Sequence, residues 1–350
     1  MLLFSLYGST TTKISHGEKV YSNRRFNSSY TPDEYFSLLE KKKVEILKVN
    51  PGSLKTVLKE GRLFLEIENQ KNDLFPVSNV FVEKLLRWFY TSTDILPYLS
   101  PDSVYSITND LLSTIYKRGR QYQVNEVKIR IEDGVALSIL GNNYVTIEDR
   151  DLYEYIKEFG VQKIVHDDHI TRFITEIKIQ KETVVGDRMG YSMHFTNSQT
   201  GFGAMTRSIF ILRYWCKNGA VSSELAKKDF YYHNSGGLPG FASSLESFPT
   251  EFSEWVDNFE ICLKEARNTK YDKKTSFRVK DLITRALPVY QTRDLIKFIE
   301  KADTIWQVYD TITTEAKKHT IYDRLLLEEV AGKVIMQFGG GIGFGGRDEE

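Results

Sequence analysis

The chain has 350 residues, of which 41% are hydrophobic and 13% aromatic, and its 47 Lys and Arg residues balance 47 Asp and Glu residues. This composition is typical of an ordered globular protein and excludes an acidic disordered chain. Because the formal net charge is zero, a globally basic nucleic-acid coat is excluded too, and any contact with a polyanion must come from a local basic patch.

The N-terminal third begins with short apolar runs between polar stretches, and we treat residues 1–75 as an N-terminal extension. Within it, we interpret Lys41-Lys-Lys43 as a solvated helix face. Apolar residues at helical spacing predict a helix over residues 80–89. Ser100-Pro-Asp102 marks the start of the next helix, because these residue types suit the N-cap, the first turn and the positive end of the helix dipole.

The middle of the chain has the pattern of β-structure. Alternating apolar residues predict a strand over 127–131, a hairpin turn at Asp133-Gly134 and a returning strand over 135–140. A short amphipathic helix is expected over 148–159 and should end at Gly160. Further strand-like segments follow at 170–179, 189–196 and 205–214.

The pattern becomes helical after about residue 244, and the chain ends in a glycine-rich segment followed by acids. We therefore expect an α+β fold, a twisted antiparallel sheet with flanking helices and a mostly helical C-terminal third. The expected divisions are an N-terminal extension (1–75), an α+β core (76–243), a helical region (244–337) and a Gly-rich acidic tail (338–350).

Motifs for catalysis or cofactor binding do not stand out. The sequence has no Gly-x-x-x-x-Gly-Lys-Ser/Thr loop, no Gly-x-Ser-x-Gly elbow and no His-Glu-x-x-His helix. The ligand-rich segment His166-Asp-Asp-His169 is interpreted as an exposed polar loop, because zinc ligands normally come from separated positions on a rigid scaffold. We therefore predict no catalytic residues, no metal and no cofactor, and favour a non-enzymatic protein.

Residues 188–217 contain four cations and no acid, although the chain as a whole is neutral. The segment also contains several aromatic residues. A sheet face of this composition can hold a single-stranded backbone by charge and stack its bases. The alternative is that the aromatic residues form core and the arginines cap the edges. The candidate nucleic-acid contacts here are Arg188, Tyr191, Arg207, Arg213, Trp215 and Lys217.

A second basic run covers residues 267–280, where six cations accompany one acid. Its candidate phosphate contacts are Lys273, Lys274 and Arg278. The alternative interpretation is a solvated connection between helices, which is the commoner role of such a charge run.

Two blocks of the sequence resemble a known family. The first block comprises Ile129-Arg-Ile-Glu-Asp-Gly134, Gly141-Asn-Asn-Tyr144 and Asp149-Arg-Asp-Leu152. The second comprises Phe195-Thr-Asn-Ser-Gln-Thr-Gly-Phe-Gly-Ala204, Leu212-Arg-Tyr-Trp-Cys-Lys-Asn-Gly219 and the later His233. In order and spacing they are similar to the phage- and plasmid-associated family called domain of unknown function nine hundred and thirty-two, over roughly residues 75–270.

The resemblance implies a setting in viral or plasmid DNA metabolism, and no particular reaction. Turn-forming residue types dominate the signature, so we interpret it as a structural turn that fixes the register of two strands. Asn197 and Ser198 are expected to form hydrogen bonds with nearby backbone groups. The signature residues are Asn197, Ser198, Gly201, Cys216, Asn218, Gly219 and His233.

Three functions are carried forward. The first is binding of single-stranded nucleic acid, including annealing in replication or recombination. The second is a structural, oligomer-forming or virion-associated protein, and the third is a metal-dependent nuclease.

The acidic tail is a candidate contact for a protein partner. Two cysteines fit a reducing compartment, and no stretch approaches the roughly 18–20 apolar residues of a membrane helix. We therefore expect a cytoplasmic protein, in the host cytoplasm if it is viral, without a membrane partner.

Overall fold

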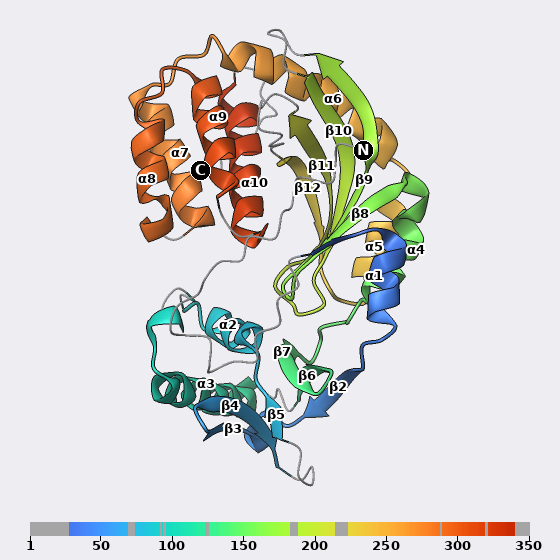
Figure 1. Cartoon of the computed structure of the whole chain (residues 1–350), viewed down its shortest axis with the longest axis vertical. Coiled ribbons are helices and arrows are strands. Elements are labelled where there is room, and N and C mark those ends of the chain that lie inside the picture. Colours follow the sequence, from blue (N-terminus) through green and yellow to red (C-terminus); the bar gives the residue numbers. More distant parts are fainter. Residues whose placement is uncertain are drawn as a thin grey trace.

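The computed structural model describes residues 28–68, 74–91, 93, 96–122, 126–182, 188–213, 223–287, 289–318 and 321–339. It confirms the α+β prediction, with antiparallel sheets throughout and helices concentrated in the C-terminal part. Two bodies are visible in Figure 1, a smaller one built from residues 44–141 and a larger one that contains the remaining elements.

The smaller body contains two three-stranded antiparallel sheets and two helices. The first sheet has the order β2-β6-β7, and the second has the order β3-β4-β5. Buried residues from both sheets and both helices form one hydrophobic cluster, which includes Leu65, Phe81 and Ile129. The elements are β2 Val44–Val49, β3 Leu54–Lys59, β4 Arg62–Ile67, β5 Leu74–Pro76, α2 Asn79–Trp88, α3 Pro101–Tyr122, β6 Val127–Glu132 and β7 Val135–Gly141, with 3-10 turns at Pro51–Ser53 and Leu96–Tyr98.

Local sequence signals explain several of these elements. Ser78 and Ser100 cap α2 and α3, because their hydroxyls accept hydrogen bonds from backbone N–H groups three residues on. Asp133 and Gly134 both have positive φ, 48° and 77°, as a two-residue type I′ turn between β6 and β7 requires.

The larger body is organised around a six-stranded antiparallel sheet of order β1-β8-β9-β10-β11-β12. Helices cover one face of this sheet, where Phe195 of β10 contacts Phe159, Phe241 and Phe248. The strands are β1 Ser28–Tyr30, β8 Val161–His166, β9 Thr171–Glu182, β10 Arg188–Asn197, β11 Met205–Arg213 and β12 Ser223–Tyr231. The helices nearest to them are α1 Pro32–Leu39, α4 Asp149–Ile156 with a 3-10 turn at Lys157–Phe159, α5 Gly237–Ser244 and α6 Phe248–Ala266.

Four helices stand beside the sheet in Figure 1, in orange and red. They are α7 Lys273–Ala286, α8 Val289–Ile299, α9 Ile305–Ala316 and α10 Ile321–Phe338. Helix α10 contacts both β12 and α6, and one hydrophobic cluster runs from the sheet through α6 into these helices. The helical region is therefore part of the larger body's core. No helix in the described part of the chain is both long and apolar enough to cross a membrane.

The expected N-terminal extension is wrong for the residues that the structure describes. Strand β1 pairs with β8, and β2 pairs with β6, so residues 28–75 contribute to sheets of both bodies. The described part of the chain begins in the larger body with β1, forms the smaller body between α1 and α4, and then returns to the larger body. The boundary expected near residue 75 thus separates no structural units, and residues 340–350 of the predicted tail lie outside the described residues.

Candidate functional site

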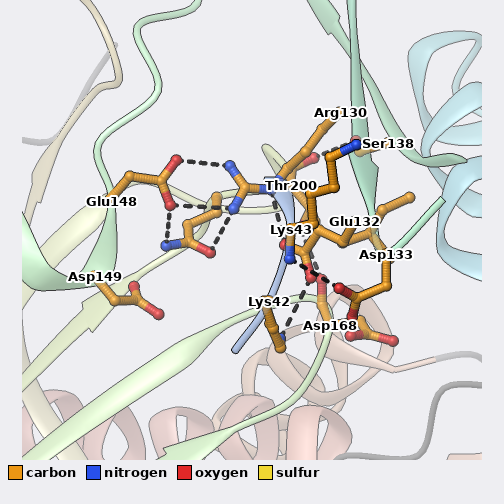
Figure 2. A network of polar contacts seen from close by, with 12 residues as sticks. Lys42, Lys43, Arg130, Glu132, Asp133, Ser138, Glu148, Asp149, Asp168 and Thr200 are labelled. Atoms are coloured by element: carbon orange, nitrogen blue, oxygen red, sulfur yellow. Dashed lines mark hydrogen bonds and ion pairs between the residues drawn. The ribbon is translucent and has the colours of Figure 1, made fainter. Parts of the chain in front are cut away.

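A buried polar network lies where the two bodies meet, with Arg130 of β6 at its centre (Figure 2). The Arg130 side chain is only 1% exposed. Its Nε lies 3.0 Å from Oε1 of Glu132, and its two terminal nitrogens lie 2.8 and 3.1 Å from the carboxylate oxygens of Glu148. Gln199 closes the ring, because its amide accepts from Arg130 and donates to Glu148.

The charges of this network compensate one another. Burial alone would lower the pKa of Arg130, but Glu148 and Glu132 outweigh that effect and raise it. Glu132 also accepts from Lys42 at 3.3 Å, and the Lys42 side chain is 6% exposed. Lys42 therefore corrects the interpretation of residues 41–43 as a solvated helix face, since α1 ends at Leu39 and Lys42 turns inward. A guanidinium that binds two carboxylates in this geometry holds its neighbours in fixed positions.

Asp149 forms a second buried centre next to this network. Its Oδ2 accepts hydrogen bonds from the hydroxyls of Tyr35 and Thr171, at 2.5 and 2.6 Å, and its Oδ1 accepts from Nδ2 of Asn197 at 2.8 Å. Burial raises the pKa of Asp149 to about 6, although these donors act in the opposite direction. Nδ1 of His166 lies within hydrogen-bond distance of both hydroxyls.

The loop of residues 198–204, between β10 and β11, contains part of the family signature, and we call it the signature loop. Residues of both bodies form hydrogen bonds with it. Ser198 Oγ accepts from the N–H of Phe202 at 2.9 Å and donates to the carbonyl of His169 at 2.7 Å. Ser138 of β7 donates to the carbonyl of Thr200 at 2.7 Å, and Lys84 of α2 donates to that of Gly201. Ser198 thus shapes its own turn, as expected, whereas the amide of Asn197 binds Asp149 and the carbonyl of Ile147 instead.

An open pocket of about 890 Å³ lies beside this loop. Three separate segments, 141–144, 201–204 and 232–234, line it together with Trp88. Tyr144 and His233 stack with ring centroids 4.7 Å apart and an interplanar angle of 8°. The Tyr144 hydroxyl donates to the carbonyl of Ser198, so the aromatic pair is tied to the signature loop.

The structure contradicts two of the predicted nucleic-acid contacts. Arg207 is 6% exposed and its guanidinium binds Asp229 and Glu251, both at 2.9 Å, and the carbonyl of Ser244. Tyr191 is 0% exposed, and its hydroxyl donates to Glu260 of α6. Neither side chain can meet a strand, because both are buried between the sheet and helices that arrive from later in the chain.

The strand predicted over 205–214 forms as β11, but the sheet face expected to hold a single strand is not open there. Residues 205–211 are all buried, so neither face of this part of β11 offers an open ledge. The alternative interpretation, in which the aromatic residues form core, describes this stretch. The side chains of Arg188 and Arg213, and residues Trp215, Cys216, Lys217, Asn218 and Gly219, lie outside the described part of the structure.

The second basic run has a different outcome. Lys273, Lys274 and Arg278 are exposed on the first two turns of α7. Phe277 lies on the same side of the helix and is 76% exposed. The alternative interpretation of this run was a solvated connection between helices. Instead, these three cations belong to helix α7.

The segment His166-Asp-Asp-His169 is not the expected exposed loop. His166 and Asp168 are 6% and 8% exposed, and backbone and side-chain groups of the loop bond within the protein. In the part of the chain that the structure describes, no three His, Cys, Asp or Glu side chains are grouped as metal ligands. The described Cys262 is buried.

The buried centres at Arg130 and Asp149 were not predicted. One local signal was present, because Arg130 and Glu132 lie two apart on a strand and therefore share a face. Tyr35, Glu148 and Gln199 join them only through the tertiary fold. The comparison of the chain with protein-family models, curated proteins and solved structures finds no match. The resemblance described above therefore rests on the sequence motifs themselves.

Proposed function

We propose that the protein binds single-stranded nucleic acid and that the exposed face of α7 makes the contact. The observation that carries this proposal is a row of exposed side chains formed by Lys273, Lys274, Phe277 and Arg278. Positions 273 and 277, and positions 274 and 278, are four residues apart, so the four side chains lie together on one side of the helix. We call this set the α7 face.

The acids near the α7 face bind other groups, although Asp272 also interacts electrostatically with Lys274. Asp272 caps α7 by accepting from the N–H of Thr275 at 2.8 Å. Asp281 pairs with Arg285 at 2.9 Å, and Glu300, directly after α8, pairs with Lys280 at 2.6 Å. No ion pair within the described residues involves Lys273, Lys274 or Arg278, so they can bind phosphates.

An exposed aromatic ring next to cations suits a single strand better than a duplex. Unpaired bases expose their faces, and stacking on an aromatic side chain contributes about 1–3 kcal/mol per base. Phe277 borders a hollow of about 360 Å³ whose lining includes the cations Lys273 and Lys280 and the acids Asp272 and Glu300. A base could therefore stack on Phe277 while its phosphates lie along Lys273, Lys274 and Arg278.

The resemblance to a phage- and plasmid-associated family supports a role in replication or recombination, with annealing as one form of it. A second function, assembly with further copies of the chain, is favoured by the same exposed Phe277, because an apolar ring at the surface also suits a subunit contact. Light scattering of the purified protein separates the two, since a large assembly that is indifferent to nucleic acid would support the second function.

The test is a fluorescence-anisotropy titration with a labelled single-stranded oligonucleotide at low salt. The variant Lys273→Ala/Lys274→Ala/Arg278→Ala should bind at least about tenfold more weakly than the wild type. A matched control, Lys48→Ala/Lys59→Ala/Arg62→Ala, removes three exposed cations from the smaller body and should bind like the wild type. Equal binding by all three proteins, or no binding by the wild type, would reject the proposal.

A further inference from the structure

The pocket between the two bodies has the chemistry of a nucleotide site. Its volume of about 890 Å³ lies within the usual range of small-molecule pockets, about 300–1,000 Å³. The segments that form it come from β7, the signature loop and the turn after β12, and each was singled out separately in the sequence. It shares no residue with the α7 face, so the inference goes beyond the proposed function.

Aromatic side chains provide flat surfaces for a planar ring. Tyr144, Trp88 and Phe202 are partly exposed in the lining, whereas His233 is only 6% exposed and stacks on one face of Tyr144. Burial lowers the pKa of His233 to about 4, so its ring is neutral at physiological pH. Offset stacking between aromatic rings is favourable, so a nucleobase can pack against this lining.

Amide side chains supply the polar groups that a base edge needs. Asn142 and Asn143 are exposed at the turn after β7, and neither amide bonds another residue of the described chain. Asn234, at the turn after β12, also lines the pocket, and its Oδ1 already accepts from the N–H of Gly236 at 3.1 Å. Each amide has both donors and an acceptor, as the edges of nucleobases do.

The charge around the pocket suits an anion. No Asp or Glu is among the described residues that line it. Lys84 Nζ and the Arg87 guanidinium lie 5.4 and 5.0 Å from the ring centre of Phe202, which forms part of the wall. Lys84 donates to the Gly201 carbonyl, and no carboxylate of the described chain pairs with it. Neither cation lines the pocket itself, but both lie beside Phe202 and make the potential at this wall positive.

We propose that this pocket binds a nucleotide, with the base against the aromatic and amide side chains and the phosphate beside Lys84 and Arg87. A free mononucleotide and a single unstacked nucleotide of a strand share this chemistry. A carbohydrate would also suit aromatic rings and amides, but the absence of carboxylates from the described lining and the two cations favour an anionic ligand.

Isothermal titration calorimetry with adenosine monophosphate, ribose 5-phosphate and an eight-residue oligodeoxyadenylate tests the proposal. The variant Gly141→Leu fills the pocket from its rim, where an added Cβ meets no atom within 4 Å. It should lower the affinity for adenosine monophosphate by about tenfold or more. The control Gly240→Leu adds the same side chain on α5, outside the pocket, at a Cβ distance of 3.7 Å from Tyr231, and should bind like the wild type.

A second variant keeps the test valid if Gly141→Leu does not fold. Asn143→Ala removes an exposed amide and should weaken binding by about fivefold, the effect of one hydrogen bond. Wild-type binding of ribose 5-phosphate as strong as that of adenosine monophosphate would overturn the proposal, because the base would then not be recognised.

Comparison of adenosine monophosphate with the oligonucleotide distinguishes a free nucleotide from a nucleotide within a strand. Binding of adenosine monophosphate that the pocket variants weaken identifies a free nucleotide. Binding of the oligonucleotide alone, again weakened by the pocket variants, identifies an unstacked nucleotide in a strand. If neither ligand responds to the pocket variants, the proposal fails. The α7-face variant separates this result from the proposed function, because it should lose oligonucleotide affinity and keep that for adenosine monophosphate.

Discussion

The hydroxyl of Tyr35 lies 2.5 Å from Oδ2 of Asp149, although the two residues are 114 positions apart. Tyr35 belongs to α1, before the smaller body begins, and Asp149 is the first residue of α4, after that body ends. Their contact joins the segment that precedes the smaller body to the segment that follows it, and so links both to the larger body. Thr171 and Asn197 donate to the same carboxylate, so α1, α4, β9 and β10 all depend on it.

The raised pKa of Asp149 predicts a pH dependence of stability. Its native pKa of about 6 exceeds the ordinary value of 3.8, so between about pH 4 and 6 the native state holds a proton that the unfolded chain has released. The free energy of unfolding of the wild type, relative to Asp149→Asn, should therefore fall by about 3 kcal/mol as the pH rises from about 4 to 7. Urea unfolding of both proteins across this range measures the difference.

His166 acts in the opposite direction and is common to both proteins. Burial lowers its pKa from 6.5 to about 3, which adds stability as the pH rises through that interval. Comparison with Asp149→Asn therefore isolates the carboxylate. Parallel stability curves for the two proteins would show that Asp149 ionises normally.

Loss of Arg130 should destabilise the protein strongly. Arg130→Met leaves Glu132 buried and deprived of its main partner, which should cost about 3–5 kcal/mol of unfolding free energy. Arg150→Met is the matched control, because Arg150 is 52% exposed and its pair with Glu40 should contribute less than about 1 kcal/mol. Chemical denaturation of both variants checks this, and similar losses would contradict the central role of Arg130.

Gly201 should tolerate no side chain. Its φ is +77°, and an added Cβ would lie 2.8 Å from Leu140 Cδ2 and 3.0 Å from Lys84 Nζ. Gly201→Ala should therefore lower the unfolding free energy by about 1–3 kcal/mol. At Gly203 the nearest atoms are 4.0 Å away, so Gly203→Ala should have a much smaller effect. Thermal melts of the two variants compare them directly, and equal melting temperatures would refute the steric argument.

Phe277 should contribute to binding without contributing to stability. Because the ring is 76% exposed, Phe277→Ala should leave the melting temperature unchanged. If a base stacks on the ring, the variant should lose about 1–3 kcal/mol of oligonucleotide affinity, and Phe277→Trp should restore it. Anisotropy titrations measure this. An Ala variant that binds like the wild type would remove the stacking role.

Elements with local signals were predicted well. The Asp133-Gly134 hairpin, the helices capped by Ser78 and Ser100 and the helix that ends at Gly160 all form where the sequence indicates. Strands β1, β2, β3, β5, β8 and β12 were missed, because each is short or polar and is defined by its pairing with another strand. Strand β8, for example, carries an exposed Gln162 and a half-buried Lys163 among its apolar residues.

The candidate site could be predicted only in part. Whether a cation is paired with an acid depends on the tertiary fold, because the acid can come from a distant part of the chain. Arg207 stands in a stretch without acids, yet its partners Asp229 and Glu251 arrive from 22 and 44 residues further along. Lys42 is likewise compensated by Glu132, 90 residues away. On α7, by contrast, Lys273, Lys274 and Arg278 are exposed, but the sequence did not indicate that they lie on a helix, and phosphate binding by them stays a prediction.

The most direct test of strand binding by the α7 face is the salt dependence of the oligonucleotide affinity. For single strands, the logarithm of the binding constant falls with the logarithm of salt concentration by about 0.7 per phosphate neutralised. Removing Lys273, Lys274 and Arg278 should therefore reduce the slope by about 2, while the Lys48/Lys59/Arg62 control keeps the wild-type slope. Identical slopes for all three proteins would contradict the account.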